Sequence, residues 1–272
     1  MYIYIFFISL KLFSQNKEMK IFDKNLSSID FNKKDKLKNI DFVYIEKPIV
    51  EIPKEIFMLE NLKGIRIQIK NDIVAPKIIS DLKKIKNLEI LEISGNNYNI
   101  DFAKPNDFFG ITKIPTEINQ LIKLKKLEIN GNLVSQINLD SKKLVNIETL
   151  NLFRNKIKSF PLELLNFIKI KNLGLENNYI KDVPEKICET MINDLTIGRN
   201  SLKEIPKCLL TKGLDYLFIN ENFISNENIE IYRKIKNKNT SLNTKNQFDI
   251  SEYPKHDSSL ELIKELNKIN SR

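Results

Sequence analysis

The sequence predicts a single elongated solenoid of the α/β class, in which short strands stack into one parallel sheet. The pattern of the segment Ile147–Leu164 recurs 23 positions later in the segment Ile170–Ile187, with every apolar position and one asparagine retained. Near the centre of each unit the apolar residues alternate with period two, which is typical of a strand with one buried side. A unit of this size cannot bury its apolar side alone, so consecutive units must stack.

The repeat divides the chain of 272 residues into regions. Residues 16–36 are polar and rich in lysine, and we expect them to form an N-terminal cap, because a terminal repeat must present a polar outer side. Residues 37–224 hold about eight units. Residues 225–272 are expected to form a C-terminal helical cap, with one degenerate strand possible within it and a final amphipathic helix.

Residues 1–15 form a short apolar run that ends in small and polar residues, Phe13, Ser14 and Gln15. This pattern is similar to a secretory signal peptide and predicts export or a bacterial cell-envelope location. The first basic residue, Lys11, follows the run instead of preceding it, so an apolar N-terminal strand and a cytoplasmic location are the alternative. The run is too short for a membrane-spanning helix, which needs about 20 residues.

One insertion interrupts the repeat after the third unit. Leu88 and Leu124 begin consecutive units but lie 36 positions apart, and the additional residues fall within 97–110. This insertion carries Tyr98, Phe108 and Phe109. Insertions in solenoids form loops on one rim, often the binding rim, so these aromatic residues either contact a ligand or fold back to cover the side of the solenoid.

The turn after each strand carries a recurrent asparagine. An asparagine side chain has both donors and an acceptor, so it can satisfy the backbone groups that the turn leaves away from water. These residues are Asn96, Asn132, Asn155, Asn178, Asn200 and Asn222. The return segment carries a recurrent proline, which predicts an extended or short helical convex side. These residues are Pro53, Pro76, Pro115, Pro161, Pro184 and Pro206.

Taken together, residues 37–224 resemble the leucine-rich repeat family. The pattern L-x-x-L-x-L-x-x-N-x-I-x-x-I-P-x-x-I, with a period of about 22 to 24 residues, is the form that the units resemble. The resemblance implies a horseshoe-shaped solenoid with the parallel sheet on its concave face and irregular or short helical segments on its convex face. It also implies a protein that binds other proteins.

The charge of the chain does not predict a nucleic-acid partner. The formal net charge is +9 and the isoelectric point is about 9.2, but lysines such as Lys181 and Lys203 are scattered between the apolar repeat positions. Binding to nucleic acid favours clustered lysine and arginine. A solvated lysine face explains this distribution better.

Cysteine and histidine usage predicts neither a disulfide nor a metal site. Cys188 and Cys208 lie in consecutive units but at different distances from Pro184 and Pro206, so we expect their side chains to point in different directions. A disulfide is possible but is not the favoured interpretation. His256 is the one histidine, and no cysteine or histidine cluster has the spacing of zinc ligands. No cofactor is expected.

No catalytic motif is evident in the sequence. It has no phosphate-binding glycine loop, and the usual general base, histidine, lies outside the array. Glu92 and Glu128 are in register on neighbouring strands, but ordinary solvated charges on a water-facing sheet are the stronger interpretation. We therefore expect a protein that is not an enzyme.

The outward positions of the strands predict where a partner would bind. Phe153, Tyr216 and Phe218 are aromatic residues among polar ones, the composition of an interface hot spot, although the C-terminal cap could equally cover the last two. The candidate partner-binding residues are Arg66, Glu92, Glu128, Asn151, Phe153, Glu176, Tyr216 and Phe218, with Tyr98, Phe108 and Phe109 of the insertion.

The function predicted from these residues is a monomeric, non-enzymatic module that binds a protein or peptide through its concave sheet. Two alternatives stay open. One is a structural or cell-envelope repeat protein without a discrete ligand, and the other is an adaptor scaffold for an enzyme on another chain.

Overall fold

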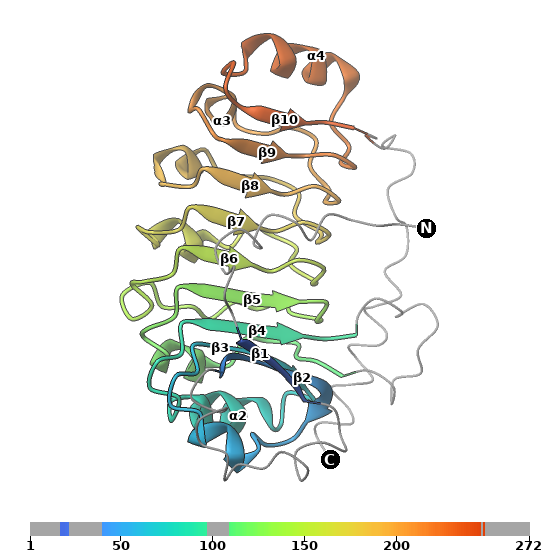
Figure 1. Cartoon of the computed structure of the whole chain (residues 1–272). Coiled ribbons are helices and arrows are strands. Elements are labelled where there is room, and N and C mark those ends of the chain that lie inside the picture. Colours follow the sequence, from blue (N-terminus) through green and yellow to red (C-terminus); the bar gives the residue numbers. More distant parts are fainter. Residues whose placement is uncertain (1–16, 22–39, 97–108, 246, 248–272) are drawn as a thin grey trace.

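The structure, a computed structural model, describes residues 17–21, 40–96, 109–245 and 247. The described residues form ten parallel strands in one sheet, in the order in which they occur along the chain (Figure 1). They are β1 (Lys17–Ile21), β2 (Ile40–Ile49), β3 (Gly64–Ile69), β4 (Ile90–Ser94), β5 (Lys126–Asn130), β6 (Thr149–Asn151), β7 (Asn172–Gly174), β8 (Asp194–Thr196), β9 (Tyr216–Phe218) and β10 (Ser241–Asn243). The predicted parallel sheet of stacked units is therefore present.

The register of the sheet brings equivalent repeat positions side by side. Leu127 pairs with Leu150, which pairs with Leu173, and all three are buried. In β5 the pattern alternates between half-buried and buried residues, as expected for a strand with one side on the core. In every unit the apolar residues occupy the same alternate positions of the strand and therefore face the same side of the sheet. One continuous apolar core therefore runs along the solenoid.

Short helical segments form the other layer. They are η2 (Lys54–Met58), α2 (Ala75–Leu82), η5 (Thr116–Gln120), η6 (Leu162–Asn166), η7 (Glu185–Glu189) and α3 (Cys208–Thr211). Proline stands directly before η2, η5, η6 and η7, where its fixed φ suits a helix start and its missing N–H costs no hydrogen bond. At least one apolar side chain of each segment, such as Ile118 or Ile187, is buried in the core.

The asparagine ladder is present and connects neighbouring units. Asn178 is buried; its Oδ1 accepts from the backbone N–H of Ile157 at 3.1 Å, and its Nδ2 donates to the carbonyls of Leu152 at 3.0 Å and Leu175 at 3.1 Å. Asn132, Asn155, Asn200 and Asn222 make the equivalent bonds. Each side chain thus satisfies buried backbone groups in its own unit and in the preceding one.

Strands extend the sheet into both predicted caps. β1 lies within the segment expected to be a polar cap and pairs with β2. At the other end, the helix α4 (Asn226–Ile235) follows the last asparagine-bearing unit, and Ser225 accepts from the N–H of Asn228 as its N-cap. β10 then pairs with β9, so the C-terminal region is not purely helical (Figure 1).

Several sequence predictions fall outside the described residues. They are the leader at 1–15, most of the insertion at 97–110 including Tyr98 and Phe108, and the final helix expected over 258–270. No helix in the described part of the chain has the length and apolar character needed to cross a bilayer.

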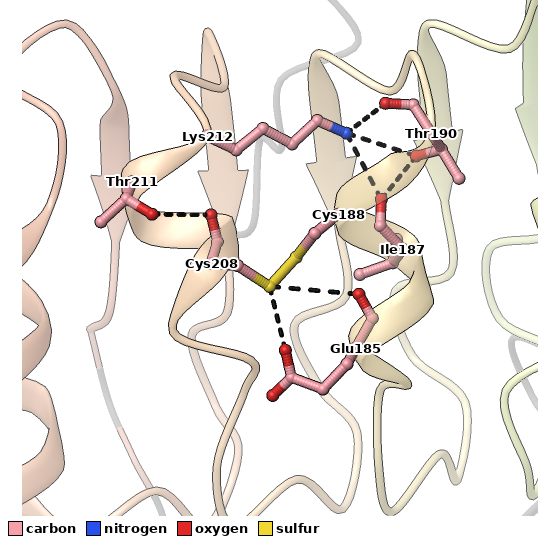
Figure 2. The surroundings of a disulfide bond; sticks show 7 residues. All are labelled: Glu185, Ile187, Cys188, Thr190, Cys208, Thr211 and Lys212. Atoms are coloured by element: carbon pink, nitrogen blue, oxygen red, sulfur yellow. Dashed lines mark hydrogen bonds between the residues drawn. A yellow bond between two sulfur atoms is a disulfide. The ribbon is translucent and has the colours of Figure 1, made fainter.

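The expectation for the cysteines is wrong, because Cys188 and Cys208 form a disulfide between consecutive units (Figure 2). Cys188 lies in the 3-10 helix η7, whereas Cys208 begins the α-helical turn α3. The two return segments have different geometry, so counting positions from the proline does not give the side-chain directions. The Cα atoms are 6.0 Å apart, within the range that a disulfide spans.

Lys212 joins the same two units on the convex side. Its ammonium donates to the carbonyls of Ile187, at 3.3 Å, and Thr190, at the C-terminal end of η7 (Figure 2). Carbonyls at the C-terminal end of a helix carry partial negative charge, so a cation there is favourable. Burial lowers the pKa of the Lys212 ammonium.

Candidate functional site

The outward positions of the strands form the candidate site on the concave face of the sheet. Leu150 and Leu152 are buried, whereas Asn151 and Phe153, which alternate with them, are half-exposed. One column across the strands is formed by Arg66, Glu92, Glu128, Asn151, Gly174, Thr196 and Phe218, as their pairing register requires. The side of the strands on which the sequence placed the candidate partner-binding residues is thus the side turned away from the core.

The N-terminal part of this face carries an ion-pair network. Nε of Arg66 donates to Glu92 at 2.6 Å, and Nζ of Lys126 lies 3.0 Å from Glu92 and 2.9 Å from Glu128. Burial on its own would lower the pKa of Lys126, but attraction by the carboxylates of Glu128 and Glu92 raises it above its usual value. Lys126 therefore stays charged and holds the two carboxylates together.

Glu92 corrects one expectation. It was expected to be an ordinary solvated charge, but it is only 6% exposed. Its charge is balanced by Arg66 and Lys126, which come from the neighbouring strands β3 and β5. A buried carboxylate with two cationic partners is a structural element, because a free general base needs an accessible lone pair.

A depression of about 320 Å³ lies beside this network. Its lining includes Arg66, Glu92, Asn130 and Phe109. Phe109 is the last aromatic residue of the insertion. Phe109 is held there because its backbone N–H donates to Oδ1 of Asn96 at 2.9 Å and its carbonyl accepts from the Asn96 N–H at 3.2 Å. The base of the insertion thus reaches the concave face.

The C-terminal part of the face carries the aromatic residues. Tyr216 and Phe218 lie on β9 with their ring centroids 6.1 Å apart. β10 pairs with β9 beside them, but both residues remain half-exposed, so the cap borders them without burying them. The backbone N–H of Phe153 donates to Oδ1 of Asn151 at 3.0 Å and of Asn130 at 3.1 Å, which fixes the backbone that presents its ring.

Acidic residues lie between these aromatic side chains. Burial raises the pKa of the Glu176 carboxyl to about 7; the charge of Arg199 opposes this rise and that of Glu221 adds to it. Burial, with the nearby charge of Asp215, also raises the pKa of Asp194. Glu176 was a candidate by position, but no sequence pattern signals its altered protonation, which depends on burial by neighbouring units.

The sequence-predicted residues therefore fall into two groups. Arg66, Glu92, Glu128 and Phe109 belong to the N-terminal group around the depression, and Phe153, Glu176, Tyr216 and Phe218 belong to the C-terminal group on and beside β6 to β9. Asn151 lies between the two groups in the sheet.

Comparison with solved structures decides the fold. A leucine-rich repeat protein of Leptospira interrogans superposes with a TM-score of 0.52 at 20% identity, over 86% of this chain and 66% of the Leptospira chain. The chain has the leucine-rich repeat fold. Internalin C2 of Listeria monocytogenes gives a TM-score of 0.53 at 18% identity, over 78% of this chain and 83% of the internalin chain. No protein-family model and no curated protein sequence matches the chain.

One further group on the leucine-rich repeat solenoid has metal-ligand chemistry. Glu185, Cys188 and Cys208 place three potential ligand atoms within 4.8 Å of one another, which the spacing of the cysteines did not predict. The two sulfur atoms are bonded to each other, whereas a metal requires thiolates. In this oxidised state the group is a disulfide beside a carboxylate (Figure 2).

Proposed function

We propose that this leucine-rich repeat solenoid binds a protein or peptide partner through its concave sheet. The observation that carries the proposal is the set of half-exposed aromatic residues, Phe153, Tyr216 and Phe218, on a sheet whose other outward positions are mostly small or polar. Aromatic side chains on a rigid scaffold lose little conformational entropy on binding and dominate the energetics of interfaces.

The charged residues of the concave face support binding over catalysis. Glu92 and Glu128 share Lys126, so neither is a free acid or base. In the C-terminal group, two of the donors of Arg199 are engaged with Glu221, at 2.8 and 3.1 Å. We infer that the protein acts without chemistry of its own and as a monomer.

We also infer that the protein is exported. The disulfide between Cys188 and Cys208 supports this, because disulfides persist mainly in oxidising compartments. The signal-like residues 1–15 point the same way. Fractionation of the source cells, with thiol labelling, tests this inference. An oxidised protein in the envelope or medium is expected, and a reduced cytosolic protein would contradict it.

The binding proposal is tested by crosslinking and affinity capture from the source organism's envelope fraction. The full chain is compared with a Phe153→Ala/Phe218→Ala variant and with a matched control, Leu162→Ala/Ile168→Ala, which removes apolar groups that are 62% and 75% exposed away from the concave face. We expect a stoichiometric partner that the concave variant loses and the control retains.

Two other outcomes would redirect the proposal. A partner retained by the concave variant would move the binding site to another surface, with the insertion at 97–110 as the first candidate. Recovery of no stoichiometric partner would favour a structural repeat protein or an adaptor for an enzyme on another chain.

A further inference from the structure

One edge of the solenoid carries exposed apolar side chains in consecutive units. The loops that run into the strands lie along this edge, because all the strands are parallel and begin on the same side of the sheet (Figure 1). We name this edge the strand-entry rim and define it by residues 83–89, 121–125, 142–148, 167–171 and 190–193. Four rim residues, each 23 positions after the one before, are 45% to 75% exposed: Ile122, Val145, Ile168 and Met191.

Hydrogen bonds hold the rim loops side by side. The backbone N–H of Glu148 donates to the carbonyl of Lys125 at 2.8 Å, and that of Lys171 donates to the carbonyl of Glu148 at 2.9 Å. Asn146 adds a side-chain bond, because its Nδ2 donates to the carbonyl of Ile122 at 3.2 Å. The loops therefore follow one another at about the 4.8 Å spacing of the strands, and the exposed apolar residues form a row.

The row is not part of the apolar core. Each of its members is adjacent in sequence to an apolar residue that is buried, and these neighbours fill the core: Leu121, Leu144, Phe167 and Ile192. Single exposed apolar residues are ordinary in soluble proteins, whereas a contiguous apolar patch marks a surface that another molecule covers. Four such residues in consecutive units form a patch of the second kind.

The same rim gathers lysines that are scattered in the sequence. It holds nine lysines and two glutamates, Glu89 and Glu148, and Glu89 already pairs with Lys125 at 3.0 Å. Six of the lysines are exposed and form no ion pair with a carboxylate in the described part of the chain: Lys83, Lys86, Lys123, Lys142, Lys169 and Lys171. The apolar row therefore runs through a strongly basic surface.

This combination fits an anionic lipid surface better than a protein or a nucleic acid. Apolar side chains enter the boundary between headgroups and acyl chains, and lysines around them bind anionic headgroups. Protein interfaces are enriched in arginine and aromatic residues and depleted in lysine, whereas the rim has no arginine and its one aromatic residue, Phe167, is buried. A nucleic acid would engage the lysines but leave the aliphatic row in water, because bases stack on aromatic side chains.

We propose that the strand-entry rim docks the solenoid by its edge on an anionic phospholipid bilayer. The apolar row enters the boundary between headgroups and acyl chains, and the rim lysines bind the lipid phosphates. This inference goes beyond the proposed partner binding and does not rest on it. The concave sheet lies on a different surface and stays open to a protein or peptide.

Sedimentation of the full chain with lipid vesicles tests the proposal. Vesicles of phosphatidylcholine alone are compared with vesicles that also hold about 30% phosphatidylglycerol, which is anionic. Ile122→Ser/Ile168→Ser removes two members of the apolar row, and Lys123→Gln/Lys171→Gln removes two charges beside it. The apolar residues 1–15 are the same in every variant, so a difference between variants reports on the rim.

Matched controls alter the opposite edge, where the strands end. Val50 and Ile73 follow β2 and β3 and are 58% and 63% exposed, so Val50→Ser/Ile73→Ser removes similar apolar groups. Lys181→Gln/Lys203→Gln removes two exposed charges at that edge. Circular dichroism and a thermal melt check that each variant folds.

We expect the wild-type protein to bind the anionic vesicles at least about tenfold more tightly than the neutral ones, and added salt should weaken this binding. Each rim variant should lose at least about tenfold in affinity for the anionic vesicles, and the controls should match the wild type. Equal binding to both kinds of vesicle, or a folded rim variant that binds like the wild type, overturns the proposal. Binding of a double-stranded DNA oligonucleotide through the rim lysines, with no binding to vesicles, also overturns it.

The two proposals fail separately. Phe153→Ala/Phe218→Ala should bind vesicles like the wild type, and a loss would place the lipid contact on the concave face. Affinity capture from detergent-solubilised envelope contains no bilayer, so the Ile168→Ala change in the capture control then affects the rim alone. Absence of vesicle binding with a captured concave partner refutes the rim contact only, and vesicle binding with no captured partner refutes the concave proposal only.

Discussion

Replacing Glu176 with glutamine should make the protein more stable at high pH and leave it unchanged at low pH. Burial raises the pKa of this carboxyl from 4.5 to about 7 in the folded protein. Folding therefore favours the protonated form. The protonated Glu176 carboxyl therefore makes its full contribution to the stability of the folded state below pH 4.5. This contribution is lost as pH rises to about 7, above which the folded state carries an unfavourable buried charge.

The expected change in the free energy of unfolding follows from the same difference between the two pKa values. At about 1.4 kcal/mol per pH unit, the distance from 4.5 to about 7 corresponds to roughly 3 kcal/mol. Glu176 is half-buried, so solvent screening reduces this value, and we expect Glu176→Gln to raise the free energy of unfolding by about 1–3 kcal/mol at pH 8. Glutamine has the same shape and no charge, so packing is preserved.

Urea denaturation at pH 8 and pH 4.5, with the disulfide intact, measures this difference. The midpoint of Glu176→Gln should exceed that of the wild type at pH 8 and equal it at pH 4.5, with an unchanged m-value. Glu189→Gln, at an exposed position, should match the wild type at both values of pH. A gain that is equal at both pH values, or a loss at pH 8, would refute the assignment of a buried, ionisable carboxyl.

Three further predictions concern the scaffold. Asn178→Ala should lower the free energy of unfolding by about 1–3 kcal/mol, because it leaves buried backbone groups of two units without partners. Urea denaturation measures this loss, and an unchanged midpoint would contradict it. Leu152→Ala should cost about 2–5 kcal/mol through a core cavity, whereas Phe153→Ala should leave the thermal midpoint nearly unchanged, and equal losses would mean that the strand faces are inverted. Reducing the disulfide, which closes a loop of 20 residues, should destabilise the protein by about 3 kcal/mol in a denaturation with and without reductant, and coincident curves would refute its structural role.

The features that the sequence predicted well are those that the repeat encodes. The parity of the apolar positions determines the side of the strand on which Leu152 and Phe153 lie, and the fixed place of Asn178 in its unit determines its role in the ladder. Both follow from one unit considered alone. The parallel sheet follows because every unit has the same pattern and must stack on the next.

The features that were missed depend on differences between neighbouring units. Cys208 approaches Cys188 because the return segment of one unit is α-helical and that of the other is a 3-10 helix. Glu92 is buried because Arg66 and Lys126 extend over it from both adjacent strands. Such contacts depend on the side chains of three consecutive strands. These side chains stand at the variable positions of the repeat, which the repeat pattern does not specify.

Photo-crosslinking from the concave face tests the central claim most directly. Phe153 is replaced with the crosslinking analogue p-benzoylphenylalanine, which resembles phenylalanine, and the same residue is introduced at Leu162, which is 62% exposed in η6 on the other side of the solenoid. After irradiation in the source organism's envelope fraction, the account predicts a discrete adduct from position 153 and none from position 162. Adducts from position 162 alone would contradict it, because the partner would then lie on the convex face.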